Sequence, residues 1–390
     1  MSRIDELIAE HCPGGVRYVE ISRLFDLRNG YTPSKSNASF WTEGTVPWFR
    51  MEDIRANGGI LDRALQQIPE IAVKGGKLFP ANSLLVATSA TIGEHALVTV
   101  PHLSNQRFTS LSVKAEYSDQ VDMKFVYYYG FVLDEWCRNN ITTSSFASVD
   151  MAGFKRFRIP VPPLEVQWEI VQVLDQFTQL EAELDAELEA RRRQYEHYRS
   201  ELLKFDTDTA LRPLGDLAEN LDRRRMPVTR DARTPGDIPY YGASGVVDYV
   251  SDFIFDGDFL LVSEDGANLL ARSTPIAFSI SGKTWVNNHA HVLRFDTYAE
   301  RRFVEIYLNS IDLSPFISGA AQPKLNKANL NRIPIPDPSL DEKERIVGLL
   351  DRFDALINDP SIGLPAELAA RRKQYEYYRD RLLTFEEATA

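Results

Sequence analysis

Three short motifs contain residue types that enzymes use, and the first matches a relaxed phosphate-binding loop. Residues 277–284 read AFSISGKT, with Gly282, Lys283 and Thr284 at its end. Such a loop must open a helix, because the helix N-terminus holds the phosphate. The residues that follow, TWVNNHAHVLRF, read as a strand. We therefore do not expect this motif to bind a nucleotide.

The second motif resembles the carboxylate set of a nuclease, with Asp337 followed by residues 341–343, Asp-Glu-Lys. These acids fall in the first turn of a predicted helix, where they complement the helix dipole. The spacing between these acids leaves no room for a β-hairpin that could place them around a metal ion. His289 and His291 would share a strand face, but no cysteine or carboxylate cluster with metal-ligand spacing joins them. We expect these histidines to be buried or on a polar surface, and we expect no metal site.

The third motif is Val161-Pro162-Pro163-Leu164, at the place where an adenine methyltransferase would carry Asp/Asn-Pro-Pro-aromatic. It lacks both the polar residue and the aromatic one. No glycine-rich cofactor loop follows a first strand either. If the chain were a stand-alone DNA methyltransferase or nuclease, its catalytic motifs would have to be ones that we do not recognise. This hypothesis stays open as the alternative.

The elements that carry these motifs occur twice. Residues 187–205 and 367–385 match at 13 of 19 positions, ELEARRRQYEHYRSELLKF against ELAARRKQYEYYRDRLLTF. Upstream, IPVP at 159–162 corresponds to IPIP at 333–336. The period is far longer than that of a solenoid repeat, so the chain is a duplicated domain followed each time by a helical segment. We divide it into residues 1–158, 159–206, 207–332 and 333–390.

Both helical segments have apolar residues in steps of three and four, which predicts a helix with one apolar face. From Glu165 to Phe205 the first helix would be roughly 60 Å long. The second should break at NDPSIGLP, residues 358–365, which contains two prolines and a glycine. Each apolar face must be buried against a partner, and the two helices can bury their apolar faces against each other as an antiparallel coiled coil. A purely structural coiled-coil protein is a further alternative. The basic clusters 191–193 and 371–373 lie on these helices, where we expect partner docking or coil-flanking charge.

The net charge of −12 belongs mainly to these helices. Residues 159–206 hold 11 acidic and 5 basic side chains, and residues 333–390 hold 12 and 8. The rest of the chain is nearly neutral, so local basic clusters can still set the field at a contact. Two isolated cysteines, no apolar run of about 18 residues and no signal core predict a cytoplasmic protein.

Residues 14–158 and 207–332 differ in sequence, yet both read as mixed α/β, or α+β, domains with short strands. VPWFR at 46–50 corresponds in place to IPYYG at 238–242, and FPANSLLVATS at 79–89 to FDGDFLLVSED at 255–265. Both domains end in a polar, basic stretch, residues 142–158 and 318–332. The two domains therefore repeat one scaffold but differ in their surface residues. This pattern indicates that one chain presents two different binding specificities on the same scaffold.

The chain resembles the specificity subunit of type I restriction-modification systems. In the second half the resemblance lies in YYGASG at 240–245, EDGANLL at 264–270, WVNNHAHV at 285–292 and QPKLNKANL at 322–330. In the first half it lies in the turn at 30–33, VPWFRMEDI at 46–54 and RIPVPPLEVQ at 158–167. It implies that each domain reads one half of a split duplex DNA target and that the helices pair with pseudo-twofold symmetry.

The same resemblance implies partners and places the chemistry in them. The helices would set the spacing of the half-sites, about one DNA turn or 34 Å apart. They would dock methyltransferase subunits, two per chain, and restriction-translocase subunits would join afterwards. S-adenosyl-methionine, ATP and Mg would then be bound by the partner subunits, with no cofactor in this chain.

Base and phosphate contacts use Arg, Lys, Asn, Gln, Ser and Thr, so we selected such residues near loops. The candidates in the first domain are Lys35, Arg50, Ser89, Thr91, Gln106, Arg107, Ser144, Ser145 and Lys155. Those in the second domain are Arg223, Arg224, Arg225, Tyr240, Tyr241, Ser244, Lys283, Asn288, His289, Lys324, Asn326 and Lys327. We favour the last three, which we place in a short basic loop after Gly319. For the tyrosine pair we expect half-buried packing rather than base stacking.

Overall fold

The computed structural model describes residues 3–143, 147–319 and 322–389. These form two compact units: residues 1–183 with residues 368–390, and residues 184–367. Each unit combines one globular domain with part of both helical segments. The division between them therefore falls within the helices and not at the ends of the globular domains.

The first unit is built around a five-stranded sheet of order β2-β9-β6-β7-β4 and a three-stranded sheet of order β5-β3-β8. Its helices are α1 (Arg3–His11), α2 (Ile21–Leu24), α3 (Met51–Asn57), α4 (Met123–Asn139), α5 (Met151–Arg156), the first part of α6 (Leu164–Leu202) and most of α12 (Leu364–Leu382). Its strands are β1 (Tyr18–Glu20), β2 (Phe25–Asn29), β3 (Val46–Phe49), β4 (Ile60–Leu61), β5 (Gln67–Ile68), β6 (Ser83–Ala87), β7 (His95–Val98), β8 (Leu103–Ser104), β9 (Phe108–Val113), β10 (Ile141–Thr143), β11 (Ala147–Val149) and β12 (Arg158–Pro160).

The second unit has two four-stranded sheets, of order β14-β21-β18-β19 and β16-β15-β20-β17. Its helices are the second part of α6, α7 (Leu214–Leu217), α8 (Asn268–Ala271), α9 (Tyr298–Ser310), α10 (Lys327–Asn331), α11 (Leu340–Asn358) and the start of α12. Its strands are β13 (Leu211–Pro213), β14 (Glu219–Asn220), β15 (Pro235–Gly242), β16 (Gly245–Val250), β17 (Phe255–Asp256), β18 (Phe259–Ser263), β19 (Ala277–Ile280), β20 (Lys283–Val286), β21 (Ala290–Arg294) and β22 (Pro334–Pro336).

The strand register makes the two globular domains equivalent position by position. In the first domain Thr109 of β9 pairs with Val86 of β6, and in the second His291 of β21 pairs with Val262 of β18. In the three-stranded sheet of the first domain β3 pairs in parallel with β8, and in the β16-β15-β20-β17 sheet of the second domain β15 pairs in parallel with β20. These pairs end five residues before the positions above, at Ser104 of β8 and Val286 of β20. The predicted correspondence of residues 46–50 with 238–242, and of 79–89 with 255–265, is therefore confirmed.

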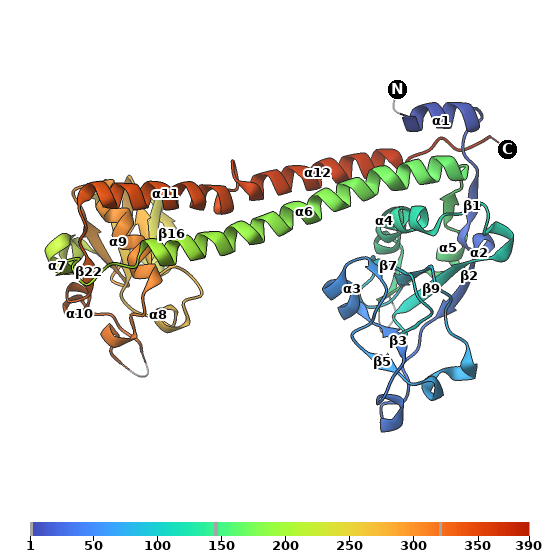
Figure 1. The fold of residues 1–390 in the computed structure, drawn as a ribbon, viewed down its shortest axis with the longest axis horizontal. Coiled ribbons are helices and arrows are strands. Elements are labelled where there is room, and N and C mark those ends of the chain that lie inside the picture. Colours follow the sequence, from blue (N-terminus) through green and yellow to red (C-terminus); the bar gives the residue numbers. More distant parts are fainter. Residues whose placement is uncertain (1–2, 144–146, 320–321, 390) are drawn as a thin grey trace. The chain divides into compact units, whose positions relative to one another are not determined.

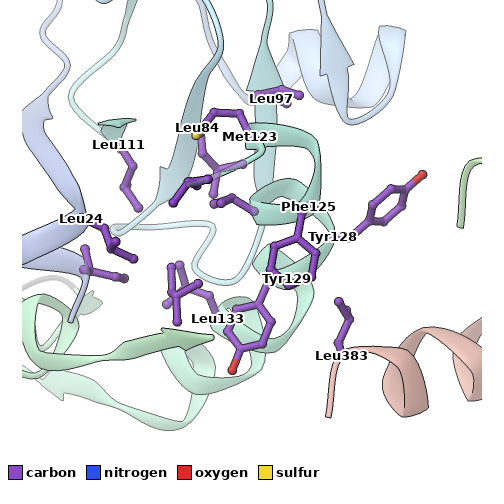
Figure 2. Packing of buried hydrophobic residues seen from close by; sticks show 14 of the residues in the cluster. Leu24, Leu84, Leu97, Leu111, Met123, Phe125, Tyr128, Tyr129, Leu133 and Leu383 are labelled. Atoms are coloured by element: carbon purple, nitrogen blue, oxygen red, sulfur yellow. The ribbon is translucent and has the colours of Figure 1, made fainter. Parts of the chain in front are cut away.

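The core of the first unit lies between its five-stranded sheet and α4. Leu84 and Leu111 of the sheet, Phe125, Tyr129 and Leu133 of α4, and Leu383 belong to one buried cluster (Figure 2). Aromatic and branched residues fill both surfaces, and α4 begins where Asp122 accepts hydrogen bonds from two backbone N–H groups. Such burial is worth about 1.5–3 kcal/mol for each large apolar side chain. In the second unit α9 covers β18 and β19 in the same way, so the sheet that contains β6 and the sheet that contains β18 each have a helix on one face.

Within each unit the helical segments lie side by side (Figure 1). In the first unit Phe177 of α6 stacks on Tyr378 of α12 and Glu181 pairs with Arg372, so the partner number falls as the α6 number rises, which is the antiparallel order. In the second unit Tyr198 of α6 packs against Phe353 of α11. The predicted break is confirmed, since α11 ends at Asn358 and α12 begins at Leu364.

A short strand lies directly before the long helix of each helical segment, and the sequence analysis did not predict these two strands. The prolines of β12 and β22 lie in strands that pair with β1 and β13 before each helix begins. Next to β1, the chain's two ends meet: Val16 donates to the Glu386 carbonyl and Ala388 donates to the Val16 carbonyl. Gly15 is required there, because a Cβ would lie 2.7 Å from the backbone nitrogen of Ala388. No helix among the described residues is long and apolar enough to cross a membrane.

Candidate nucleic-acid interface

Each globular domain brings three segments together at one end of one sheet, the sheet that contains β6 in the first domain and β18 in the second, and we call these the sheet-end loops. In the first domain they are residues 88–94 after β6, 105–107 before β9 and 147–150 before α5. In the second they are residues 264–268 after β18, 287–289 before β21 and 322–326 before α10. Loops held by a rigid sheet are where binding residues concentrate in proteins.

The same backbone hydrogen bond joins the first and third segments in both domains. The Val149 N–H donates to the Thr88 carbonyl at 2.9 Å, and the Leu325 N–H donates to the Glu264 carbonyl at 2.8 Å. One residue further on, Asp150 and Asn326 cap α5 and α10. The two polar stretches that differ in sequence therefore have one local structure.

The middle segment is also the same turn in both domains. The Asn105 side chain accepts a hydrogen bond from the Arg107 N–H at 3.0 Å, and Asn287 accepts from the His289 N–H at 2.8 Å. An Asn side chain that folds back on the backbone two residues later is a common way to close a tight turn. The turn exposes Gln106 with Arg107, and Asn288 with His289.

The Gly30–Pro33 turn supports this middle segment in the first domain. Thr32 donates a hydrogen bond to the Gln106 side chain, and the Tyr31 N–H donates to the Ser104 carbonyl at 2.8 Å. A Cβ on Gly30 would lie 2.0 Å from the Asn105 carbonyl oxygen, so only glycine fits. Lys35 is exposed in the loop that follows.

The sheet-end loops of the second domain are held by charges. Arg225 donates to Glu264 at 2.6 Å, and Lys324 lies 3.0 Å from the same carboxylate. Burial raises the pKa of Glu264, but these two cations outweigh it and hold the pKa below its usual range. Asp265 accepts from His289 at 2.9 Å. The loops therefore combine basic and acidic groups and are not a uniformly positive surface.

Several of the predicted residues lie in or beside the sheet-end loops. In the first domain Ser89 forms a bridge with Ser148, Thr91 follows in the same loop, and Gln106 and Arg107 are exposed beside it. Arg50 directly precedes α3, and its backbone N–H donates to the Asp53 carboxylate at 2.7 Å. Its half-buried guanidinium lies 5.6 Å from the centre of the Trp48 ring. The predicted Ser144 and Ser145 lie outside the described residues. Lys155 is exposed on α5.

In the second domain Asn288, His289 and Lys324 lie together, and Ser244 is exposed in the turn between β15 and β16. The Ser263 hydroxyl reaches the Ala243 carbonyl and ties that turn to the end of β18. These exposed side chains are available to a ligand from solvent.

Other predictions for the second domain need correction. Tyr240 is only 1% exposed, and its hydroxyl accepts from the Val228 N–H, so it packs in the core and is not at the surface. Tyr241 is half-buried, as expected. Asn326 and Lys327 do not lie in a loop, because Asn326 caps α10 and Lys327 is its first residue.

Three further arginine and lysine candidates lie in and around the short helix η5 (Asp222–Arg224) and β20. Arg223 is exposed, whereas Arg224 donates to the Ile254 carbonyl and covers the Phe255 ring. Lys283 covers Phe253 at the start of β20, at the other end of that strand from the sheet-end loops. Arg224 and Lys283 therefore have local structural partners.

The motifs examined for catalysis have structural explanations. Gly282 and Lys283 connect two strands, β19 and β20, and no helix follows to hold a phosphate. Asp337 pairs with Arg212 and Lys343. His289 lies outside β21, so it does not share a strand face with His291, which is buried. No group of three or more metal-ligating side chains is found among the described residues.

Comparison with known proteins accounts for this duplicated architecture. The family model described as type I restriction modification DNA specificity domain matches twice, over residues 13–190 and 207–370. The chain belongs to this family of type I specificity subunits. The specificity subunit of the type I restriction enzyme EcoprrI from Escherichia coli is 43% identical over 360 residues, which are 88% of each chain.

Another family member and two solved structures are also similar to this chain. A putative type I specificity subunit from Haemophilus influenzae is 38% identical over 191 residues, 48% of this chain and 49% of that one. Among solved structures, the S subunit from M. genitalium has a TM-score of 0.54 at 16% identity, over 95% of this chain and 96% of that one. A chain from a study of complex assembly in the type I R-M system has a TM-score of 0.61 at 15% identity, with 95% and 98% covered. These likenesses confirm the predicted fold.

Proposed function

We propose that this specificity subunit binds a bipartite duplex DNA target, one half with the sheet-end loops of each domain. The observation that supports this most strongly is the equivalence of the two loop sets. The same turn presents Gln106 and Arg107 in one domain and Asn288 and His289 in the other. These residue types hydrogen-bond base edges in the major groove, and a different pair in each domain would select a different half-site.

The same proposal makes the chain a non-catalytic subunit whose partners supply the chemistry. Methyltransferase subunits would bind S-adenosyl-methionine, and restriction-translocase subunits would bind ATP and Mg. The sheet-end loops contain acidic side chains beside their basic ones, which weakens their attraction for DNA. The affinity for DNA would therefore depend on these partner subunits as well. The paired helices would set the distance between the half-sites.

A duplicated apolar patch on the helices supports two copies of one partner. In the first unit Leu180 is 45% exposed, one turn from Phe177, whose ring contacts Tyr378. In the second unit Leu356 is 38% exposed, one turn from Phe353. Tyr198 contacts that Phe353 ring as Tyr378 contacts Phe177. An exposed leucine at the same position of both helical repeats, one turn from an aromatic contact between helices, is therefore our candidate contact for a partner present in two copies.

The DNA part of the proposal is tested with the chain assembled with its methyltransferase subunits. Exchanging Gln106-Arg107 with Asn288-His289 leaves Asn105 and Asn287, which close the two turns, so the fold should be retained. It removes only the contacts of Gln106 with Thr32 and of His289 with Asp265. We expect the methylated sequence to change in both halves, because each domain would carry the other's turn. An unchanged target after the exchange would show that these turns do not read bases. Methylation or cleavage by the purified chain alone, with S-adenosyl-methionine or Mg²⁺, would support the alternative of a stand-alone enzyme.

The partner part is tested by replacing the exposed leucines with glutamate, singly and together. Leu180→Glu and Leu356→Glu should each lose one methyltransferase copy, and the double variant should lose both, as measured by native mass spectrometry. Ile362→Glu is the matched control, because Ile362 is 78% exposed in the break between α11 and α12 and outside both patches. Full assembly of the double variant would contradict the assignment of the patch.

A further inference from the structure

His291 occupies the centre of the charged cluster beneath the sheet-end loops of the second domain. Its side chain is 1% exposed. Nδ1 lies 2.6 Å from the Asp222 carboxylate, and Nε2 lies 2.7 Å from the Leu325 carbonyl oxygen. The ring therefore bridges η5 and the segment that leads into α10.

Both atoms that face the ring nitrogens are hydrogen-bond acceptors. A backbone carbonyl has no hydrogen to donate, so Nε2 must carry a proton. Asp222 also accepts from the Asn220 side chain and the Val292 N–H, each at 3.0 Å, which is the environment of an ionised carboxylate. Nδ1 must then carry a proton as well. The geometry gives a doubly protonated imidazolium in the protein interior.

Charges from every neighbouring segment surround this imidazolium. Asp222 and Glu264 are its two acidic neighbours, with a Glu264 oxygen 3.8 Å from Nδ1. Arg225 lies against both carboxylates, and Lys324 pairs with Glu264 from the solvent side. Burial raises the pKa of Asp222, but the hydrogen bonds from His291 and Val292 and the charge of Arg225 hold the pKa below its usual range.

The equivalent position of the first domain has no charge. Thr109 stands where His291 stands, and its hydroxyl donates to Asn29 at 3.1 Å. Thr88, the counterpart of Glu264, shares a hydrogen bond with Thr109 at 2.9 Å. The two domains thus use one strand register to build a neutral connection in one case and an ionic one in the other.

We infer that His291 is a positioning residue for the second half-site, which as an imidazolium ties residues 324–331 to the end of the sheet. The inference rests on the proposed function, because it assigns a role in DNA recognition to the segment that His291 holds. Loss of one ring proton removes one of the two hydrogen bonds and releases either Asp222 or the Leu325 carbonyl. Recognition of the second half-site therefore depends on the protonation of His291, and recognition of the first does not.

The protonation state is measured on the full chain without DNA, by ¹⁵N NMR of ring-labelled histidine, with His291→Gln used for assignment. We expect both His291 ring nitrogens to carry protons. In His291→Gln, which cannot donate to both acceptors as the imidazolium does, the Leu325 amide should exchange with solvent at least tenfold faster than in the wild type. A single protonated ring nitrogen, or unchanged exchange in His291→Gln, would overturn the inference.

The role in recognition is measured on the complex with methyltransferase subunits. His291→Gln should reduce discrimination against altered second half-sites about tenfold and leave the first half-site unchanged. Thr109→Val, at the equivalent position, should affect only the first half. If His291→Gln does not fold, Asp222→Asn, which keeps the shape and removes the charge, is used in its place. Equal loss at both half-sites would overturn the inference. A wild-type complex with no sequence preference would instead refute the proposed function, and the NMR result would be unaffected.

Discussion

Arg107→Ala gives a direct measure of what one sheet-end residue contributes to target recognition. Arg107 is exposed in the turn before β9, and its guanidinium has no hydrogen-bonding or ionic partner among the described residues. Removing it therefore costs the folded chain almost nothing. The turn should persist, because the Asn105 side chain accepts from the Arg107 backbone N–H, which alanine keeps.

The size of the effect follows from the contact that Arg107 would make. A bidentate arginine–guanine pair contributes about 1–3 kcal/mol of discrimination, which is a factor of roughly 5 to 150 in affinity. The loss should fall on one position of the first half-site. An arginine that contacts only a phosphate would instead weaken binding to all sequences and reduce the salt slope by about 1.

The assay is competition binding of the assembled methyltransferase with DNA variants altered one base pair at a time in each half. His289→Ala is the matched variant, since it removes the equivalent side chain of the second domain. Arg107→Ala should relax one position of the first half, and His289→Ala one position of the second. An Arg107→Ala complex with unchanged affinity, selectivity and salt dependence would refute the assignment of this turn to DNA.

Two further changes test the support of the sheet-end loops. Gly30→Ala should impair recognition of the first half-site more than Arg107→Ala does, because its Cβ would lie 2.0 Å from the Asn105 carbonyl oxygen; Gly14→Ala, with nothing within 4 Å, is the control, and the same selectivity assay measures both. The pKa of Glu264 is depressed in the folded chain, so its ionised form stabilises the second unit above the unfolded carboxyl pKa, and that stability is lost as pH falls through the lower folded pKa. Unfolding curves from neutral to acid pH should show this loss, and Glu264→Gln should flatten the dependence.

The helices were predictable from sequence because their apolar spacing is regular and repeated. The start of the first long helix after Pro163 and the break of the second near Pro360 follow from the local sequence pattern. The antiparallel order follows because each helix must bury its apolar face. The corresponding strands at 46–49 and 235–242 were also predictable, since each is an aromatic run beside a turn signal.

The interface was predictable only in part. Exposed polar loop residues such as Arg107 and Asn288 could be selected by type, but their equivalence depends on strand register, which one sequence with little internal identity does not reveal. Tyr240 was misplaced because a tyrosine beside a turn gives no sign of which side of its strand faces the core. The roles of Glu264 and His291 arise from contacts between residues as much as 69 positions apart, as His291 is from Asp222.

The central claim is that each domain reads its own half of one target. Its most direct test exchanges residues 1–158 for the first domain of another type I specificity subunit and maps methylated adenines across a host genome. The account predicts that one half of the methylated sequence changes and the other half is kept. A change in both halves, or in neither, would contradict it.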